Sequence, residues 1–185
     1  VDELVPRSKL METALERANE FAAQSSRPID AKGIKLKPIS HQMNSNSITY
    51  KTISVTLDRN LHTAEITVQA PENEPPHDTQ GIQAAGADFW PLSFARDFDD
   101  FILHMRANEP EISTWVFKSI GNANFIEAGD NVLTENPDDW LVKEITLYLK
   151  RTLKRLDVSS RSIISLIEPG SCFTGTLLEL VLASD

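Results

Sequence analysis

The turn between Gly170 and Gly175 is the part of the sequence best suited to chemistry. It follows a predicted strand of branched apolar residues at 162–167 and leads into a predicted apolar helix at 177–183. Free N–H groups at the start of such a helix point toward the carboxyl end of the sheet. There they stabilise a developing oxyanion or hold a phosphate.

Glu179 adds a carboxylate to this turn. It lies about one helical turn beyond Gly175, in a helix that is otherwise apolar. Its side chain is therefore expected either to be buried among apolar neighbours or to face a wet cleft, where a carboxylate acts as a general acid or base. The alternative is structural: the glycines only make a tight turn, and Glu179 reaches solvent.

Other reactive side chains give weaker signals. The four histidines are far apart and lack the spacing of metal ligands, so no metal site is predicted. Cys172 has no histidine partner in the pattern and is expected to be a small buried thiol rather than a nucleophile. The sequence has no phosphate-loop or dinucleotide fingerprint, and we therefore expect no bound cofactor.

Composition narrows the class of protein. The chain has 185 residues, of which 41% are hydrophobic and 24% charged, as in a globular protein of one domain or one domain plus an attached piece. The formal charge of −9 argues against nucleic acid as a partner. No apolar run approaches the roughly 20 residues of a membrane helix. The single cysteine cannot form an internal disulfide, which favours a cytoplasmic location.

A helix, a linker and a β-hairpin are expected in the first 70 residues. An amphipathic helix follows Ser8 and ends near Ser25, with a stripe that is mostly alanine. Residues 28–47 show no periodicity and predict a linker. Alternation over 50–70 then predicts a β-hairpin with one buried face.

The remaining elements are expected to alternate between helices and strands. They are a helix from Asp88 with an aromatic stripe, a strand at 112–118, a helix from Pro137, the strand at 162–167 and the final helix. The order β-β-α-β-α-β-α predicts an α/β fold with a mostly parallel sheet and helices packed on it.

Several of these segments resemble the crotonase (enoyl-CoA hydratase/isomerase) superfamily. The last eleven residues, GTLLELVLASD, are similar to the family's glycine-rich turn and following helix, which carries a glutamate in many hydratases and ends in Ala-x-Asp. The hairpin over 54–68 resembles the family's first two strands. Residues 1–5 with the helix after them resemble the C-terminal end of a crotonase domain.

The resemblance implies a partial crotonase-like (ClpP/crotonase) fold. Residues 1–27 would be the detached C-terminal helix of a preceding domain, 28–47 a linker, and 48–185 the N-terminal half of a second domain. The chain would then be an internal fragment of a longer protein, expected to be inactive by itself and to pack against its missing flanking domains.

The resemblance also implies a set of site residues. The family's first oxyanion N–H follows a glycine after the third strand, a place taken here by Gly129 and Asp130. The second falls on Thr176, next to Gly175, and Glu179 matches the first catalytic glutamate of the hydratases. Asp130 departs from the small or apolar residue usual there, and the family's second catalytic glutamate has no counterpart in this chain.

Two further patterns have alternative interpretations. The sequence AAGAD at 84–88 spells the hydratase oxyanion motif, but it precedes a helix instead of following a strand–helix–strand unit, so we interpret it as a loop leading into that helix. Four cations crowd the end of the helix from Pro137: Lys150, Arg151, Lys154 and Arg155. They either complement the helix dipole or contact coenzyme A phosphates.

The activity implied by the resemblance is chemistry on an acyl-CoA substrate. The most similar branch is a lyase branch of aromatic compound degradation. It opens an oxidised benzoyl-CoA derivative by adding water and releases formate, with an oxyanion hole that holds the thioester enolate. Coenzyme A would be part of the substrate, and a homo-oligomer is expected. The alternatives are a non-catalytic crotonase-like interaction module and a generic enoyl-CoA hydratase or isomerase.

Overall fold

The computed structural model describes residues 2–26, 30 and 33–185. The chain divides into two units, residues 1–33 and 34–185. The predicted boundary between the first helix and the linker, at residues 27 and 28, lies outside the described residues. Residues 34–47, predicted as the rest of the linker, belong to the second unit.

The first unit contains the predicted helix. α1 spans Leu10–Ala23 and follows a 3-10 turn at Arg7–Lys9. None of the described residues of this unit is buried, and the apolar side chains of Leu10, Leu15 and Phe21 are exposed. The prediction of a helix is confirmed, and its apolar residues have no core within the unit.

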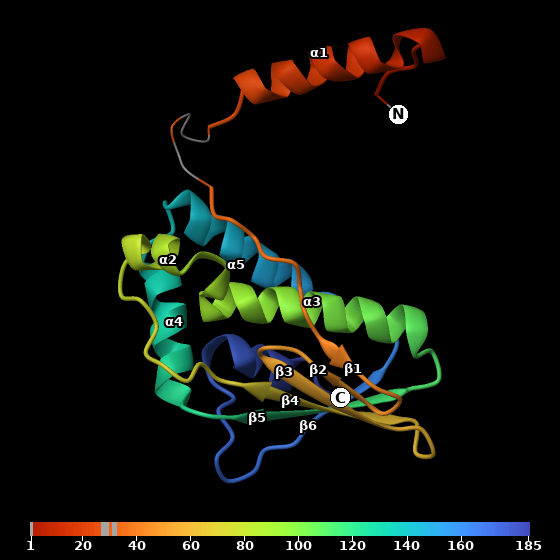
Figure 1. Cartoon of the computed structure of the whole chain (residues 1–185), viewed down its shortest axis with the longest axis vertical. Helices are drawn as coiled ribbons and strands as arrows, with labels where there is room; N and C mark the ends of the chain where they lie inside the picture. The colour runs from red at the N-terminus through yellow and green to blue at the C-terminus, as the bar shows by residue number, and fades with distance from the viewer. Residues whose placement is uncertain (1, 27–29, 31–32) are drawn as a thin grey trace. The chain divides into compact units, whose positions relative to one another are not determined.

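The second unit is built on one sheet of six strands that pair in chain order (Figure 1). The strands are β1 (Gln42–Met43), β2 (Ser47–Thr49), β3 (Ile53–Asp58), β4 (Thr63–Gln69), β5 (Thr114–Ile120) and β6 (Ser162–Ser165). β3 and β4 form the predicted hairpin, with Val55 opposite Ile66.

The prediction of a mostly parallel sheet is wrong. The pairings from β1 to β4 are antiparallel, and only β4–β5 and β5–β6 are parallel. The difference comes from β1, which lies in the stretch predicted as linker, and from β2, which begins at the last residue of that stretch. Strands of two and three residues are too short to show alternation, so their sequence looked like a loop.

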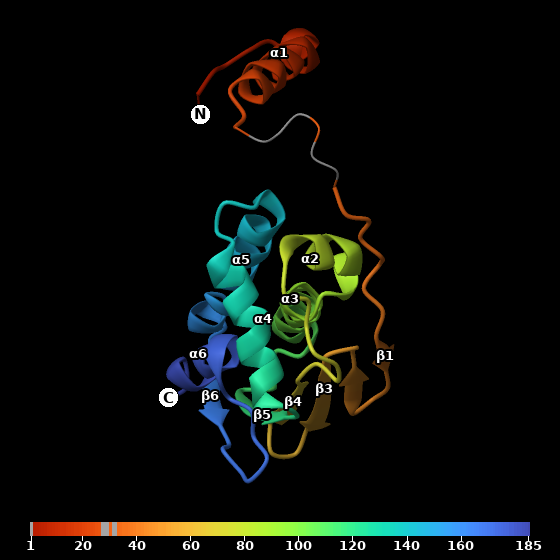
Figure 2. The same ribbon diagram turned by 90° about the vertical axis from the view of Figure 1, so that its left-hand side faces the viewer.

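Helices cover one face of this sheet (Figure 2). They are α2 (Thr79–Ala85), α3 (Trp90–Asn108), α4 (Ala123–Glu135), α5 (Trp140–Leu153) and α6 (Leu178–Leu182). The aromatic stripe of α3 forms the core, as predicted: Phe98 packs edge-on against Phe117 of β5, and Phe101 packs on Trp115, with ring centroids 5.8 and 5.2 Å apart. This contact holds the helical layer to the parallel part of the sheet.

α5 packs on α3 in the same layer. Its buried residues include Leu141, Ile145 and Leu149, which repeat at helical spacing. Asp139 caps its first turn by accepting hydrogen bonds from the N–H groups of Leu141 and Val142. The predicted helix from Pro137 is therefore confirmed, with its start fixed by the aspartate.

Candidate active site

A cavity of about 700 Å³ lies between α4, α5 and the turn that leads into α6. We call it the α4–α5 cavity. Four of the five predicted site residues line it: Asp130, Gly175, Thr176 and Glu179. Its remaining lining is largely apolar: Leu133, Thr134, Pro137, Val142, Lys143, Thr146, Leu147, Leu149 and Leu153. The structure thus brings Asp130 next to Thr176, which is 46 positions away in the chain.

The turn at the cavity is held by buried neighbours on both sides. Gly175 has φ +50°, a conformation that side chains with a Cβ rarely adopt, and it starts a 3-10 turn that runs into α6. Leu177 and Leu180 are fully buried and anchor the segment that follows. Before the turn, the N–H of the buried Cys172 donates to Ser119 Oγ at 2.9 Å. The prediction of a buried thiol is confirmed.

Glu179 is exposed and lines the α4–α5 cavity. The structure therefore excludes a carboxylate buried among apolar residues, whereas a carboxylate that faces the cavity and one that only reaches solvent both agree with it. An exposed carboxylate at a cavity wall can exchange protons with water or with a ligand.

Gly129 and Asp130 do not form the predicted turn. They lie in the middle of α4, where the N–H of Asp130 belongs to the hydrogen-bond ladder of the helix. That amide is already used, so the predicted pair of backbone donors is not formed. Gly129 faces α3 instead, where a Cβ on it would lie 3.5 Å from Pro91 Cγ, an ordinary contact.

It is the side chain of Asp130, not its amide, that reaches the turn. Oδ2 accepts the N–H of Thr176 at 2.5 Å, and Oδ1 accepts the Thr176 hydroxyl at 2.6 Å. A Cβ on Gly175 would clash with Asp130 Oδ2, so the contact requires glycine at this position. Burial raises the pKa of Asp130, the two bonds from Thr176 oppose that rise, and the charge of Glu127 adds to it.

A second contact between α4 and the turn was missed by the sequence reasoning. The hydroxyl of Thr174 donates to Glu127 Oε1 at 2.6 Å. This contact could be expected only if α4 were predicted to be a helix. The sequence does contain a helical pattern there. Asn122 is a capping residue, and its Oδ1 accepts the N–H of Asn124; Ile126, Gly129 and Leu133 then follow at spacings of three and four.

Comparison with known proteins gives one clear relationship. No family model matches the chain. Over all 185 of its residues, the chain is 40% identical to benzoyl-CoA-dihydrodiol lyase of Aromatoleum evansii. The chain is a relative of that lyase. It spans 33% of the lyase's length. The lyase is a crotonase-superfamily enzyme, so the resemblance stated from the sequence is confirmed.

In this relative of the lyase, the cations at the end of α5 divide into two groups. Arg155 Nε lies 3.0 Å from Asp99 Oδ1, and Arg151 lies over the ring of Tyr148. Both arginines thus have partners within the helical layer. Lys150 and Lys154 instead line a hollow of about 510 Å³ that also includes Glu179. The suggested contact of these lysines with coenzyme A phosphates stays a prediction.

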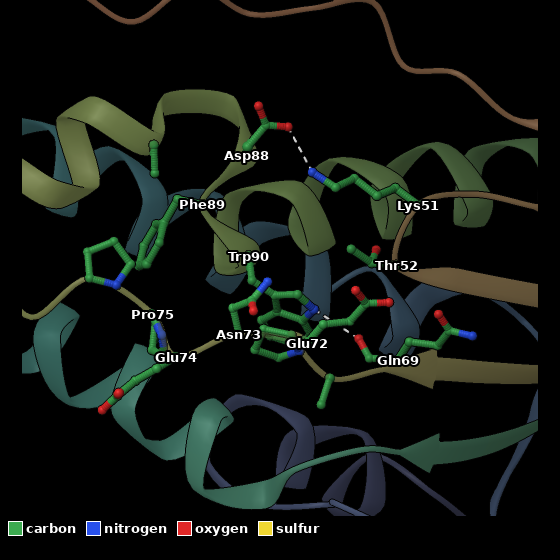
Figure 3. A pocket seen from close by; sticks show the side chains of 14 residues that line it. Lys51, Thr52, Gln69, Glu72, Asn73, Glu74, Pro75, Asp88, Phe89 and Trp90 are labelled. Atoms are coloured by element: carbon green, nitrogen blue, oxygen red, sulfur yellow. Dashed lines mark hydrogen bonds and ion pairs between the residues drawn. The ribbon is translucent and has the colours of Figure 1, made fainter.

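A third hollow lies beside the start of α3 (Figure 3) and holds none of the predicted site residues. Its volume is about 350 Å³. Asp88, the last residue of the AAGAD sequence, forms ion pairs with Lys37 and Lys51, which lower its pKa to about 2. The indole N–H of Trp90 donates to Gln69 O at 2.9 Å. The AAGAD segment precedes α3, as predicted, but it is not a loop: Ala84 and Ala85 end the unpredicted helix α2, and Gly86–Asp88 form a 3-10 turn.

The described residues show neither a metal site nor a membrane segment. Across 2–26, 30 and 33–185, no group of histidine, cysteine, aspartate and glutamate side chains is arranged to bind a metal ion. Over the same ranges, none of the helices has the length and apolar character that crossing a membrane requires.

Proposed function

We propose that the chain is a segment of a crotonase-type lyase that acts on a coenzyme A thioester. The observation that carries this proposal is the 40% identity, from end to end, with a lyase named for benzoyl-CoA. The α4–α5 cavity offers a place for the acyl group, because it has apolar walls and polar groups at one side.

In the proposed reaction, water adds to the oxidised ring of a benzoyl-CoA derivative, the ring opens, and formate is released. The thioester oxygen becomes negative as an enolate forms and needs hydrogen-bond donors that are already in position. Thr176 offers two such donors, its N–H and its hydroxyl. Both now point at Asp130, which must turn away before a thioester oxygen can take its place. Glu179 would move the proton from its position at the cavity wall.

The proposed domain organisation follows the same relationship. We assign residues 1–27 to the C-terminal helix of a preceding crotonase-like domain. We assign the second unit, which was predicted as 48–185 and begins at residue 34, to the first half of a second domain. The mixed sheet with helices on one face is compatible with part of a crotonase-like fold.

A second function has a specific observation in its favour. In a non-catalytic crotonase-like module, the site donors would be permanently occupied by the protein itself. The bonds from Thr176 to the Asp130 carboxylate are of this kind, and the Asp130 amide is used within α4. Such a segment would contribute packing to a longer enzyme whose chemistry lies elsewhere.

A binding and turnover experiment separates these functions. The chain is titrated with benzoyl-CoA and with free coenzyme A by calorimetry. It is then incubated with the oxidised benzoyl-CoA substrate and with crotonyl-CoA, and formate is measured. Tighter binding of benzoyl-CoA than of coenzyme A supports a site for the acyl group. Formate release from the first substrate supports the lyase, and hydration of crotonyl-CoA alone supports a generic hydratase.

Glu179→Gln tests the acid–base role, with Glu135→Gln as its control. Glu135 is exposed at the end of α4 and does not line the α4–α5 cavity. If turnover is seen, Glu179→Gln is expected to lower it by about 10²-fold or more, the usual contribution of a general acid or base, and Glu135→Gln is expected to leave it unchanged. Equal binding of benzoyl-CoA and coenzyme A, without turnover, would favour the non-catalytic module.

A further inference from the structure

The donors of Thr176 are fully used by one side chain. The Asp130 carboxylate accepts the N–H with one oxygen and the hydroxyl with the other, at 2.5 and 2.6 Å. Hydrogen bonds to an ionised acceptor are roughly twice as strong as neutral ones. A neutral carbonyl oxygen that approaches Thr176 therefore meets donors that already have a stronger acceptor.

The carboxylate is held in this position by the fold. Asp130 is on α4, a helix of 13 residues with a capped start, and the Glu127–Thr174 bond ties the same helix face to the same turn. Gly175 leaves the space that the carboxylate fills, since a Cβ there would clash with Oδ2. Three features of two elements, α4 and the turn, thus fit the carboxylate to the turn.

The charges around the contact matter for any oxygen that becomes negative there. Glu127 lies one helical turn before Asp130, and Glu179 and Lys143 line the same cavity. With Asp130 ionised, these groups comprise three carboxylates and one ammonium. A second negative oxygen beside Asp130 is unfavourable because like charges at close range repel.

We propose that Asp130 is a resident competitor of the acyl oxygen for the N–H and hydroxyl of Thr176, and that it sets the affinity of the α4–α5 cavity for acyl-CoA. The identity of the ligand rests on the proposed function, whereas the competition rests on the contacts of Asp130 alone. The cavity accepts an acyl oxygen at Thr176 only in the fraction of molecules whose carboxylate has left, which lowers the apparent affinity by that fraction.

Asp130→Ala tests this role in the full chain, with benzoyl-CoA as the probe. The variant is expected to bind benzoyl-CoA about tenfold tighter or more, the effect of removing one competing charge-assisted hydrogen bond. Its affinity for free coenzyme A, which has no thioester oxygen, is expected to be unchanged. Asp138→Ala is the matched control, because it removes an exposed carboxylate that does not line the cavity. Unchanged or weaker benzoyl-CoA binding by a folded Asp130→Ala chain would overturn the proposal.

The amide of Thr176 provides a readout that does not depend on coenzyme A. In Asp130→Ala, its hydrogen exchange is expected to accelerate, and added acetate is expected to shift its NMR signal; neither is expected in the original chain at neutral pH. If neither the original chain nor the variant binds benzoyl-CoA, the proposed function fails. The acetate experiment then tests by itself whether Asp130 competes for the donors of Thr176. If the Thr176 amide responds neither to the substitution nor to acetate, the proposal that Asp130 competes for its donors is rejected.

Asp130→Asn covers the case in which the alanine variant does not fold. An asparagine of the same size keeps one neutral acceptor for the N–H of Thr176. Its gain in benzoyl-CoA affinity is expected to be smaller than that of alanine, and acetate is expected to shift the Thr176 signal less. An asparagine variant that matches the original chain in every readout would show that the charge of Asp130 has no role.

Discussion

Gly129 and Gly175 belong to the two elements that enclose one side of the α4–α5 cavity, and each precedes a residue proposed as a backbone donor. Gly129 lies inside α4 with helical geometry and faces Pro91. Gly175 has φ +50° and faces the Asp130 carboxylate. The residue after Gly129 therefore has its N–H in a helix, and the residue after Gly175 has its N–H directed at the Asp130 carboxylate. A glycine therefore indicates a turn only where the backbone adopts a positive φ, which other residues rarely adopt.

The largest expected effect comes from Gly175→Ala. An alanine there must adopt a positive φ and its Cβ clashes with Asp130 Oδ2, so we expect a loss of about 1–3 kcal/mol in the free energy of unfolding. Urea unfolding measures it. Combined with Asp130→Ala, the same substitution is expected to cost less, because the clash is gone and only the strain is left. Equal costs in both backgrounds would show that the clash does not matter.

A smaller effect of opposite sign is expected for Gly129→Ala. The position is helical, the new Cβ meets Pro91 at an ordinary distance, and alanine loses less backbone entropy than glycine in a helix. The free energy of unfolding should rise by about 0.5–1 kcal/mol in the same urea experiment. A loss of stability here would mean that the close approach of α4 to α3 requires glycine, and the contrast between the two positions would disappear.

The smallest expected effect is a pH dependence from Asp130. Its pKa in the folded chain is raised above the ordinary 3.8 by burial. The folded state therefore binds this proton first as the pH falls. The stability from this proton is fully present below the unfolded pKa and is lost as pH rises through the folded pKa.

Asp130→Asn isolates this contribution. The difference in unfolding free energy between the original chain and the variant is measured from pH 3 to 7, a range set about the unperturbed aspartate pKa. Relative to the variant, the original chain should be most stable at the acid end. Burial also raises the pKa of Asp97. Because Asp97 is present in both chains, its contribution cancels in the difference. A difference that does not change with pH, or one that grows as the pH rises, would contradict the raised pKa.

Much of the fold follows from local patterns in the sequence. The hairpin of β3 and β4, the aromatic stripe of α3 and the helix α5 each depend on residues close together in the chain, and each was predicted. β1, β2, α2 and α4 were missed because their patterns are short or contain residues typical of loops. α4 contains Gly129 and begins after Asn122, which look like a loop until the spacing of its apolar residues is considered.

The candidate site likewise has one part that the local sequence predicts and one part that depends on tertiary contacts. The closeness of Gly175, Thr176 and Glu179 needs only the chain connecting them, so the sequence predicted it. The position of Asp130 depends on a contact across 46 residues. The sequence placed Asp130 at the site through the resemblance, but it assigned the wrong group, the amide in place of the carboxylate.

By itself, the sequence determined the crotonase resemblance, the apolar core residues and the turn that carries Thr176, because these are set by composition and by neighbours along the chain. Only the tertiary structure decided that the donors of Thr176 already have an acceptor. That outcome depends on where α4 packs against the turn, which buries a carboxylate beside a glycine and directs two hydrogen bonds to it.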